Sequence, residues 1–176
     1  MRVRVLEKVI HRRGAGAVES KRNELDRVDR ALLRALSVNA RASGSALAAE
    51  VGVAESTVSL RLRRLQNLGY IRGYHADIDL ATLGASLQAL IAVRLVKHAR
   101  DEIDAFRAAA PHLPGVLGLF HMAGADDYLL HVAAHDATEL RDFVLTHLTG
   151  HAAVAHTETN LIFEHVEGDG WQELLE

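Results

Sequence analysis

Residues 56–64, S-T-V-S-L-R-L-R-R, combine short hydroxyl side chains with a cluster of arginines. Short hydroxyl side chains let a backbone approach base edges closely, and guanidinium groups bind phosphate oxygens. The stretch therefore indicates a nucleic-acid contact, although a solvated helix face explains a run of arginines equally well by itself. The candidate contact residues are Ser56, Thr57, Ser59, Arg61, Arg63 and Arg64.

The spacing of apolar residues places this stretch on a helix from about Glu55 to Leu68. Val58, Leu62 and Leu65 recur on one face, which is the periodicity of an amphipathic helix. Arg61 falls at the border of the two faces. The opposite face carries Ser56, Ser59, Leu60, Arg63, Arg64 and Asn67.

The segment before this helix predicts a helix-turn-helix. Ser43 suits the N-cap of a preceding short helix, and Gly52 stands where that helix needs a residue tolerant of positive φ. A further helix is expected over 25–38, with Asp26 and Asp29 forming a capping box. In such a motif the second helix of the pair enters the major groove of DNA. Residues 70–79 predict a strand or small hairpin, which would complete a winged helix-turn-helix.

The net charge of −3 conceals a strong asymmetry along the chain. Residues 1–74 hold 15 Lys and Arg against 7 Asp and Glu, a net charge of +8, whereas residues 75–176 hold 5 against 16, a net charge of −11. A basic half joined to an acidic half indicates that the first half meets a polyanion. Chance segregation of surface charge is the alternative explanation.

The second half predicts a ferredoxin-like domain. Strands are expected over 86–96, 116–122, 128–134 and 154–166, and helices over 101–110 and 136–148, which is the order β-α-β-β-α-β. The fold class is therefore α+β. Helices of this unit cover one sheet face, and the other carries Leu90, Ala92 and Val96, so we expect a symmetric homodimer that packs sheet against sheet.

These patterns divide the chain into five segments. Residues 1–24 form a basic extension, 25–74 the DNA-binding domain, 75–85 a connector, 86–166 the sheet domain, and 167–176 an acidic tail with Trp171. The chain has no cysteine, which excludes disulfides, thiol catalysis and thiolate metal sites. No apolar run approaches the ~20 residues that span a bilayer. We expect a cytoplasmic, nucleoid-associated protein.

Three blocks of the sequence resemble one family. They are LDRVDRALLRAL with NARAS over 25–43, LAAEVGVAESTVSLRLRRLQNLGYIRGYHADID over 47–79, and the pair MAGADDYLLHV (122–132) and HTETNLIFEHV (156–166). Together they resemble the leucine-responsive/asparagine-synthesis regulator (Lrp/AsnC) family of prokaryotic transcription regulators. The resemblance runs from Leu25 to about Val166.

The resemblance implies a sequence-specific regulator that is modulated by a small ligand. It implies a ligand-binding β-α-β-β-α-β domain and dimers that assemble further, often to octamers, with an amino acid as effector and no other cofactor. The DNA contacts it implies are the six residues named above. The ligand residues it implies are Gly124, Ala125, Asp126, Asp127, Tyr128, Thr157 and Thr159.

The chemistry of the ligand turn is consistent with an amino acid. Its ammonium needs a carboxylate, which Asp126 or Asp127 supplies, and its carboxylate needs N–H donors, which the tight turn at Gly124 supplies. Two aspartates that only stabilise a hairpin turn are the alternative.

The sequence departs from the family pattern at three positions. Ala54 replaces the serine that usually caps the recognition helix, Leu60 stands where a polar or basic residue is common, and Ala125 replaces a polar residue in the ligand turn. We expect Leu60 to alter the base preference, through contact with a thymine methyl group.

Two other functions compete with a ligand-modulated regulator. Histidine pairs (His147 with His151, His131 with His135) leave open a metal-responsive regulator or a metalloenzyme. A nucleoid-organising protein without a ligand is the other alternative. The sequence holds no nucleophile–base pairing, Walker loop or dinucleotide fingerprint, so we do not predict an enzyme.

Overall fold

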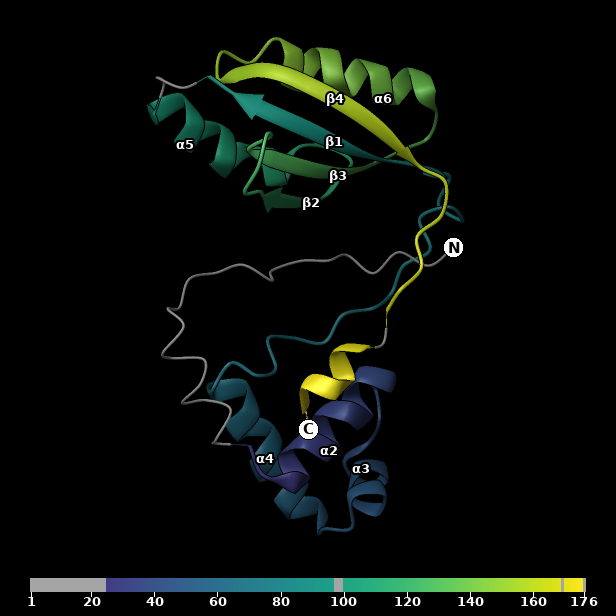
Figure 1. Ribbon diagram of the computed structural model, residues 1–176. Coiled ribbons are helices and arrows are strands. Elements are labelled where there is room, and N and C mark those ends of the chain that lie inside the picture. The colour runs from purple at the N-terminus through teal and green to yellow at the C-terminus, as the bar shows by residue number, and fades with distance from the viewer. Residues whose placement is uncertain (1–24, 97–99, 169, 176) are drawn as a thin grey trace. The chain divides into compact units, whose positions relative to one another are not determined.

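The computed structural model describes residues 25–96, 100–168 and 170–175. The predicted basic extension, residues 1–24, lies outside them. The described residues form two compact units, each with its own core (Figure 1). Residues 25–76 form a helical unit together with the tail from Glu167, and Asp77–Val166 form a sheet unit. No helix among the described residues is long and apolar enough to cross a membrane.

Within residues 25–76, the helical unit contains three α-helices, α2 (Arg27–Val38), α3 (Gly44–Val51) and α4 (Glu55–Asn67). The predicted capping box of α2 is present, since the backbone N–H of Asp29 donates to Asp26 Oδ1 at 2.9 Å and that of Asp26 donates to Asp29 Oδ2 at 3.4 Å. Ser43 caps α3, as predicted. The core of the unit consists of Leu32, Ala35, Leu47, Val58 and Leu65. These contacts confirm the helix-turn-helix.

The predicted strand or hairpin over 70–79 is wrong. Residues 71–77 lie in no strand, and Ile78 makes an isolated bridge. The side chains of residues 72–78 are exposed, so the alternating pattern has no core to face. A strand also needs a partner for its backbone groups, and alternation alone does not supply one.

The sheet unit has the predicted β-α-β-β-α-β order. Its strands are β1 (Leu87–Leu95), β2 (Val116–His121), β3 (Tyr128–Ala134) and β4 (Val154–Ile162). They pair antiparallel in the order β2-β3-β1-β4. The last strand therefore ends at Ile162, before the predicted Val166.

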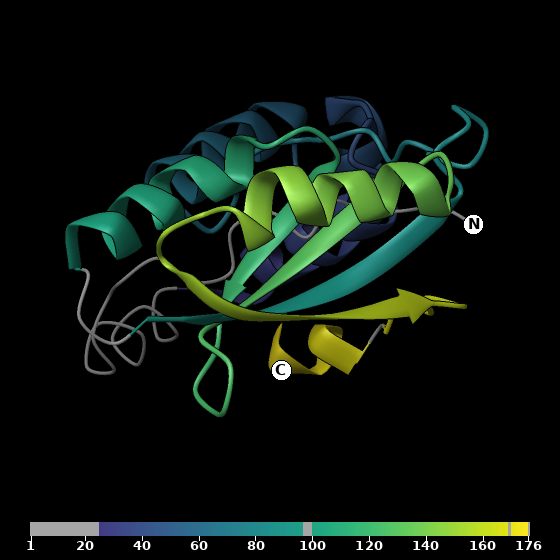
Figure 2. The same ribbon diagram turned by 90° about the horizontal axis from the view of Figure 1, so that it is seen from above.

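The helices α5 (Arg100–Ala109) and α6 (Ala137–Phe143) cover one face of this sheet (Figure 2). A 3₁₀ turn η1 (Ala110–His112) follows α5, and α6 continues as a π-helix η2 (Val144–Thr149). A short 3₁₀ helix η3 (Gly170–Leu175) forms the tail. The core beneath α5 and α6 includes Ile91, Val93, Phe106, Leu130 and Leu148, all at most 1% exposed.

The opposite side of the sheet, which we call the uncovered sheet face because α5 and α6 lie on the other side, mixes apolar and polar groups. It is formed by alternate residues of the strands, Gln88, Leu90, Ala92 and Arg94 of β1, Leu129, His131 and Ala133 of β3, Phe120 of β2 and Glu158 of β4. Several of its side chains are nevertheless buried within the chain, namely Gln88, Ala92, His131 and Ala133. Gln88 and His131 are both buried, and their side chains meet at 2.9 Å between Oε1 and Nε2. This bond satisfies two polar groups that burial would otherwise penalise.

The buried His131 predicts a loss of stability at acid pH. Burial, and secondarily the charge of His165, lower the pKa of His131 in the folded protein. As pH falls below about 6.5, an unfolded histidine gains a proton that the folded one resists. We therefore expect the free energy of unfolding to fall from pH 8 to pH 5.5, and to fall less in His131→Gln, which keeps a polar partner for Gln88. Urea unfolding at both pH values measures this, and an unchanged pH dependence in the variant would contradict it.

Candidate functional site

The turn between α3 and α4 sets the direction of α4. Gly52 has φ 75° and ψ 38°, a left-handed conformation that glycine adopts without strain. Its backbone N–H and that of Val53 both donate to the carbonyl of Ala48, at 2.9 and 3.1 Å. This closes α3 and lets α4 begin three residues later.

The N-terminus of α4 lacks a side-chain cap. Ala54 is the N-cap residue and provides no side-chain hydrogen bond, which agrees with the departure noted in the sequence. The carbonyl of Ala54 accepts from Thr57 N–H at 2.9 Å and from Val58 N–H at 3.1 Å. The acidic Glu55 in the first turn favours the positive end of the helix dipole.

One side of α4 packs into the core and the other is exposed. Val58 and Leu65 are fully buried. Ser56, Ser59 and Arg63 are exposed, and Thr57 is half-buried. Leu60 is 69% exposed and lies between them. We call the residues Ser56, Ser59, Leu60, Arg63 and Asn67 the exposed face of α4.

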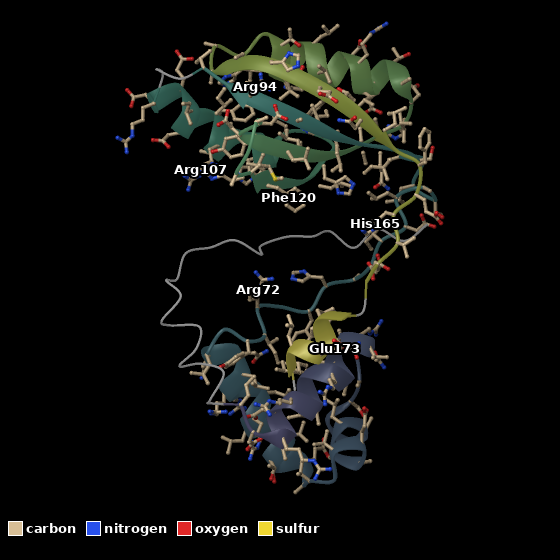
Figure 3. The ribbon with its side chains drawn as sticks, in the orientation of Figure 1. Arg72, Arg94, Arg107, Phe120, His165 and Glu173 are labelled. Atoms are coloured by element: carbon tan, nitrogen blue, oxygen red, sulfur yellow. The ribbon has the colours of Figure 1, made fainter. Side chains whose placement is uncertain are left out.

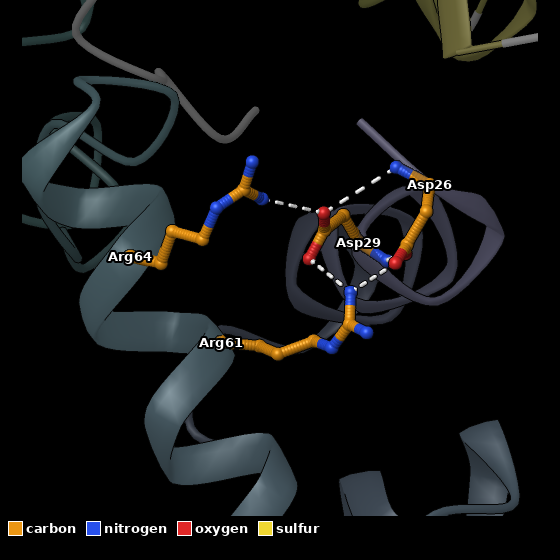
Figure 4. A network of polar contacts seen from close by, with 4 residues as sticks. All are labelled: Asp26, Asp29, Arg61 and Arg64. Carbon is orange, nitrogen blue, oxygen red and sulfur yellow. Dashed lines mark hydrogen bonds and ion pairs between the residues drawn. The ribbon is translucent and has the colours of Figure 1, made fainter. Parts of the chain in front are cut away.

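Arg61 and Arg64 turn toward α2 (Figure 4). The carboxylate of Asp29 accepts from Arg61 Nη1 at 3.1 Å and from Arg64 Nη1 at 2.8 Å. Asp29 itself is fully buried, and Arg61 also pairs with Asp26. Two of the predicted DNA contacts are thus bound to the first helix of their own unit. Their assignment to DNA stays a prediction.

The network also shifts the pKa of Asp26 and that of Arg61. The backbone N–H of Asp29 and then the guanidinium of Arg61 lower the pKa of Asp26. The bonds to Asp26 and Asp29 raise the pKa of Arg61. Both groups therefore stay ionised at neutral pH, and the carboxylates hold the arginines in place.

A second candidate site is the turn between β2 and β3, residues 122–127. Arg94 lies near the end of β1 (Figure 3), where its Nε donates to the carbonyl of Ala125 at 2.9 Å and its Nη2 donates to Asp126 Oδ1 at 3.2 Å. The side chain of Arg94 is 50% exposed and that of Asp126 is 33% exposed. The turn therefore presents one accessible cation beside one accessible anion.

Asp127 has a structural role in this turn. The pairing of β1 with β4 shifts between Arg94 and Leu95, and Asp127 Oδ2 accepts from the backbone N–H of Leu95 at 2.8 Å. Its own backbone N–H donates to the carbonyl of Val93 at 3.0 Å. The carboxylate thus satisfies a donor at the irregular end of β1.

The remaining predicted ligand residues are distributed over the turn, the start of β3 and the helix-covered face of β4. Val93 pairs with Tyr128 on one side and with Thr157 on the other. Tyr128 and Thr157 are therefore separated by one strand, or about 10 Å. Tyr128 is buried and stacks on His121 with ring centroids 4.9 Å apart, whereas Thr159, opposite Ile91, is exposed. Gly124 belongs to the turn beside Ala125.

A cavity of about 210 Å³ lies elsewhere in the sheet unit, between β3 and α6. It includes none of the predicted ligand residues. Its lining includes Pro114, Val132, Glu139, Asp142, Phe143 and His147.

The histidine pairs contact other groups. His147 packs on Phe143 and His151 packs on Phe106, each with ring centroids 5.2 Å apart. His131 bonds Gln88, and His135 pairs with Glu139 at 2.7 Å. Within residues 25–96, 100–168 and 170–175, no three or more His, Asp or Glu side chains gather as metal ligands do.

Sequence reasoning missed Arg94 and the role of Asp29. Arg94 is the one charged residue in the apolar strand Leu87–Leu95. A lone charge in an apolar strand indicates a candidate binding residue. Asp29 was recognised as a capping residue, but its contacts with Arg61 and Arg64 join residues more than thirty positions apart, which local spacing does not reveal.

The Asp29 network predicts a stability effect. Asp29→Ala removes a buried carboxylate that holds two guanidinium groups, so we expect the helical unit to lose about 2 kcal/mol of unfolding free energy. Glu50→Ala, at an exposed position of α3, is the control and should change little. Urea unfolding followed by circular dichroism checks both, and equal stabilities would show that the network contributes nothing.

Comparison with known proteins gives a consistent result. Residues 25–66 match the AsnC-type helix-turn-helix domain, and residues 88–171 match the Lrp/AsnC ligand binding domain. The chain is 48% identical over 145 residues to the HTH-type transcriptional regulator AldR of Mycolicibacterium smegmatis, covering 82% of this chain and 85% of that one. It is 46% identical to AldR of Mycobacterium tuberculosis over 157 residues, covering 89% and 88%.

Solved structures agree with the sequence relatives. A transcriptional regulator of Neisseria meningitidis, solved as a complex with L-Met, superposes with a TM-score of 0.78 at 30% identity, covering 82% of this chain and 93% of that one. The structure of MtbAldR superposes with a TM-score of 0.65 at 43% identity, covering 82% and 98%. The chain belongs to the Lrp/AsnC family of transcription regulators, with a helix-turn-helix domain and a ligand-binding domain.

Proposed function

We propose that this regulator binds operator DNA through the exposed face of α4 and binds an amino acid beside Arg94 and the turn Gly124–Tyr128, as a homodimer or larger assembly. The exposed face of α4 carries the proposal, because its hydroxyl and guanidinium groups point away from the core of the unit. The proposal assigns the chain no catalytic activity. It places the protein in the cytoplasm, where operator DNA is available.

The DNA contact divides into base and phosphate contacts. Ser56, Thr57 and Ser59 occupy the first turns of α4, the part of a recognition helix that meets base edges. Arg63 is exposed on the same side and suits a phosphate or a guanine edge. Arg61 and Arg64 support the docking in two ways in this proposal, by holding α4 against α2 and by adding positive potential.

The effector contact follows from the two opposite charges at the turn. An amino acid has a carboxylate and an ammonium group at one carbon atom. In the proposal the guanidinium of Arg94 binds the carboxylate and Asp126 binds the ammonium, so the ligand replaces the direct 3.2 Å contact between them. Asp127 shapes the turn. Thr157 and Thr159 pair with Val93 and Ile91 and so lie on the other face of the sheet from Arg94; they take no part in this contact. The L-Met complex of the Neisseria meningitidis regulator is consistent with this ligand class.

The first test addresses DNA. Arg63→Ala should weaken binding to operator DNA and reduce the slope of log K against log salt by about 0.9, because one phosphate contact is lost. Arg107→Ala, an exposed position of α5 in the sheet unit, is the matched control. Fluorescence anisotropy at several salt concentrations measures both, and an unchanged slope in Arg63→Ala would rule out the assigned phosphate contact.

The second test addresses the effector. In a thermal-shift panel of the twenty amino acids, at least one should raise the melting temperature of the wild type, since a ligand of the native state stabilises it. Arg94→Gln and Asp126→Asn should abolish the shift while DNA binding without effector persists. Arg141→Gln, which breaks the exposed pair with Asp142, should respond as the wild type does. A normal response in Arg94→Gln would exclude the site.

The same panel separates the nucleoid-organising alternative. A protein of that kind would bind DNA with little sequence preference and respond to none of the amino acids. The accessible Arg94–Asp126 pair favours a regulator with a ligand. No melting-temperature shift with any amino acid would favour the nucleoid-organising protein instead.

The third test addresses assembly. On the uncovered sheet face, Leu90, Leu129 and Phe120 remain partly exposed, and packing them against a second copy removes apolar area from water. Light scattering at micromolar concentration should therefore give a mass that is a multiple of two chains of 19.2 kDa, with an octamer as the largest expected form. A single-chain mass would contradict the proposal.

A further inference from the structure

Leu60 is an apolar side chain on an otherwise polar surface. It is 69% exposed and belongs to neither core of the protein. Val58 and Leu62, two positions away on either side, both face the core of the helical unit. Burial of apolar surface therefore does not explain a leucine at this position.

The neighbours of Leu60 are the residues proposed to meet DNA. Ser56, one turn before it, and Arg63, three positions after it, share its side of the helix because residues three and four apart lie together. Ser56, Ser59 and Arg63 are all exposed. Any base edge that these residues reach lies within reach of Leu60 as well.

The contacts of Arg61 and Arg64 with Asp29 reduce the number of long side chains around Leu60. Arg61 and Arg64 follow Leu60 by one and four positions, but both direct a guanidinium nitrogen to the buried carboxylate of Asp29. Figure 4 shows both guanidinium groups pointing toward Asp29 of α2. On the exposed face of α4, the neighbours of Leu60 are therefore the small hydroxyls of Ser56 and Ser59 and the side chain of Arg63. The duplex can approach the isobutyl group closely.

The chemistry of base edges selects one partner for such a group. In the major groove, thymine presents a C5 methyl group, whereas the other edges present hydrogen-bond donors and acceptors. A leucine against a donor or acceptor leaves it unpaired and dehydrated, which costs free energy. A leucine against the methyl group removes apolar surface of both from water.

We propose that Leu60 is a specificity-determining residue that reads the C5 methyl group of a thymine in the major groove. This inference rests on the proposed function, because it requires α4 to enter that groove. It predicts that the operator has a thymine at one position, which the protein recognises through an apolar contact.

Deoxyuridine provides a direct test, because it differs from thymidine only in lacking the C5 methyl group. Duplexes are first selected by the wild-type protein from a random-sequence pool. Each thymine of the enriched site is then replaced in turn by deoxyuridine, and binding to wild type, Leu60→Ala and the control Val38→Ala is measured. Val38 is 82% exposed on α2, so this control also removes an exposed apolar side chain.

At one thymine per half-site, deoxyuridine should weaken wild-type and Val38→Ala binding about fourfold per methyl group, and Leu60→Ala binding by much less. A substitution effect that is the same in wild type and Leu60→Ala, or absent at every thymine, overturns the inference while leaving the proposed function intact. Failure of the wild type to bind any duplex in the pool overturns the proposed function itself, and this inference with it.

Discussion

The buried carboxylate of Asp29 is the contact on which the DNA-binding surface depends. It takes part in the capping box of α2 and binds two arginines of α4. A single side chain therefore stabilises the start of α2 and holds one side of α4 against it. A buried charge is tolerated only when it is paired and hydrogen-bonded. The same pairing directs Arg61 and Arg64 toward α2, whereas Ser56, Ser59, Leu60 and Arg63 are exposed on α4.

The sheet unit uses a comparable arrangement at its candidate ligand site. At the end of β1, where the pairing with β4 shifts, the Leu95 N–H donates to the side chain of Asp127. Neighbouring Arg94 is thereby held beside Ala125 and Asp126. In both units an aspartate with a structural role holds an element that carries residues of the proposed binding surface, α4 in one unit and the turn beside Arg94 in the other.

Much of this architecture was predictable from the sequence, because its determinants are local. Asp26 and Ser43 cap helices, Gly52 makes the turn, and the periods of apolar residues give the order of helices and strands. The prediction was wrong for 70–79, where Tyr70 and Ile71 pack on the core of the helical unit but residues 72–78 are exposed. It also did not anticipate the Asp29–Arg64 and Arg94–Asp126 contacts, because these depend on how distant segments pack. The ligand residues were predicted from family resemblance, and that assignment stays a prediction.

The central claim is that the exposed face of α4 is the surface that meets DNA. The chain has no cysteine, so Ser59→Cys creates a single attachment point for a photoactivated cross-linker, and Thr138→Cys on α6 provides the matched control. On irradiation with duplexes selected by the protein, the account predicts cross-links to bases from position 59 and none from position 138. Efficient cross-linking from position 138 with none from position 59 would contradict it.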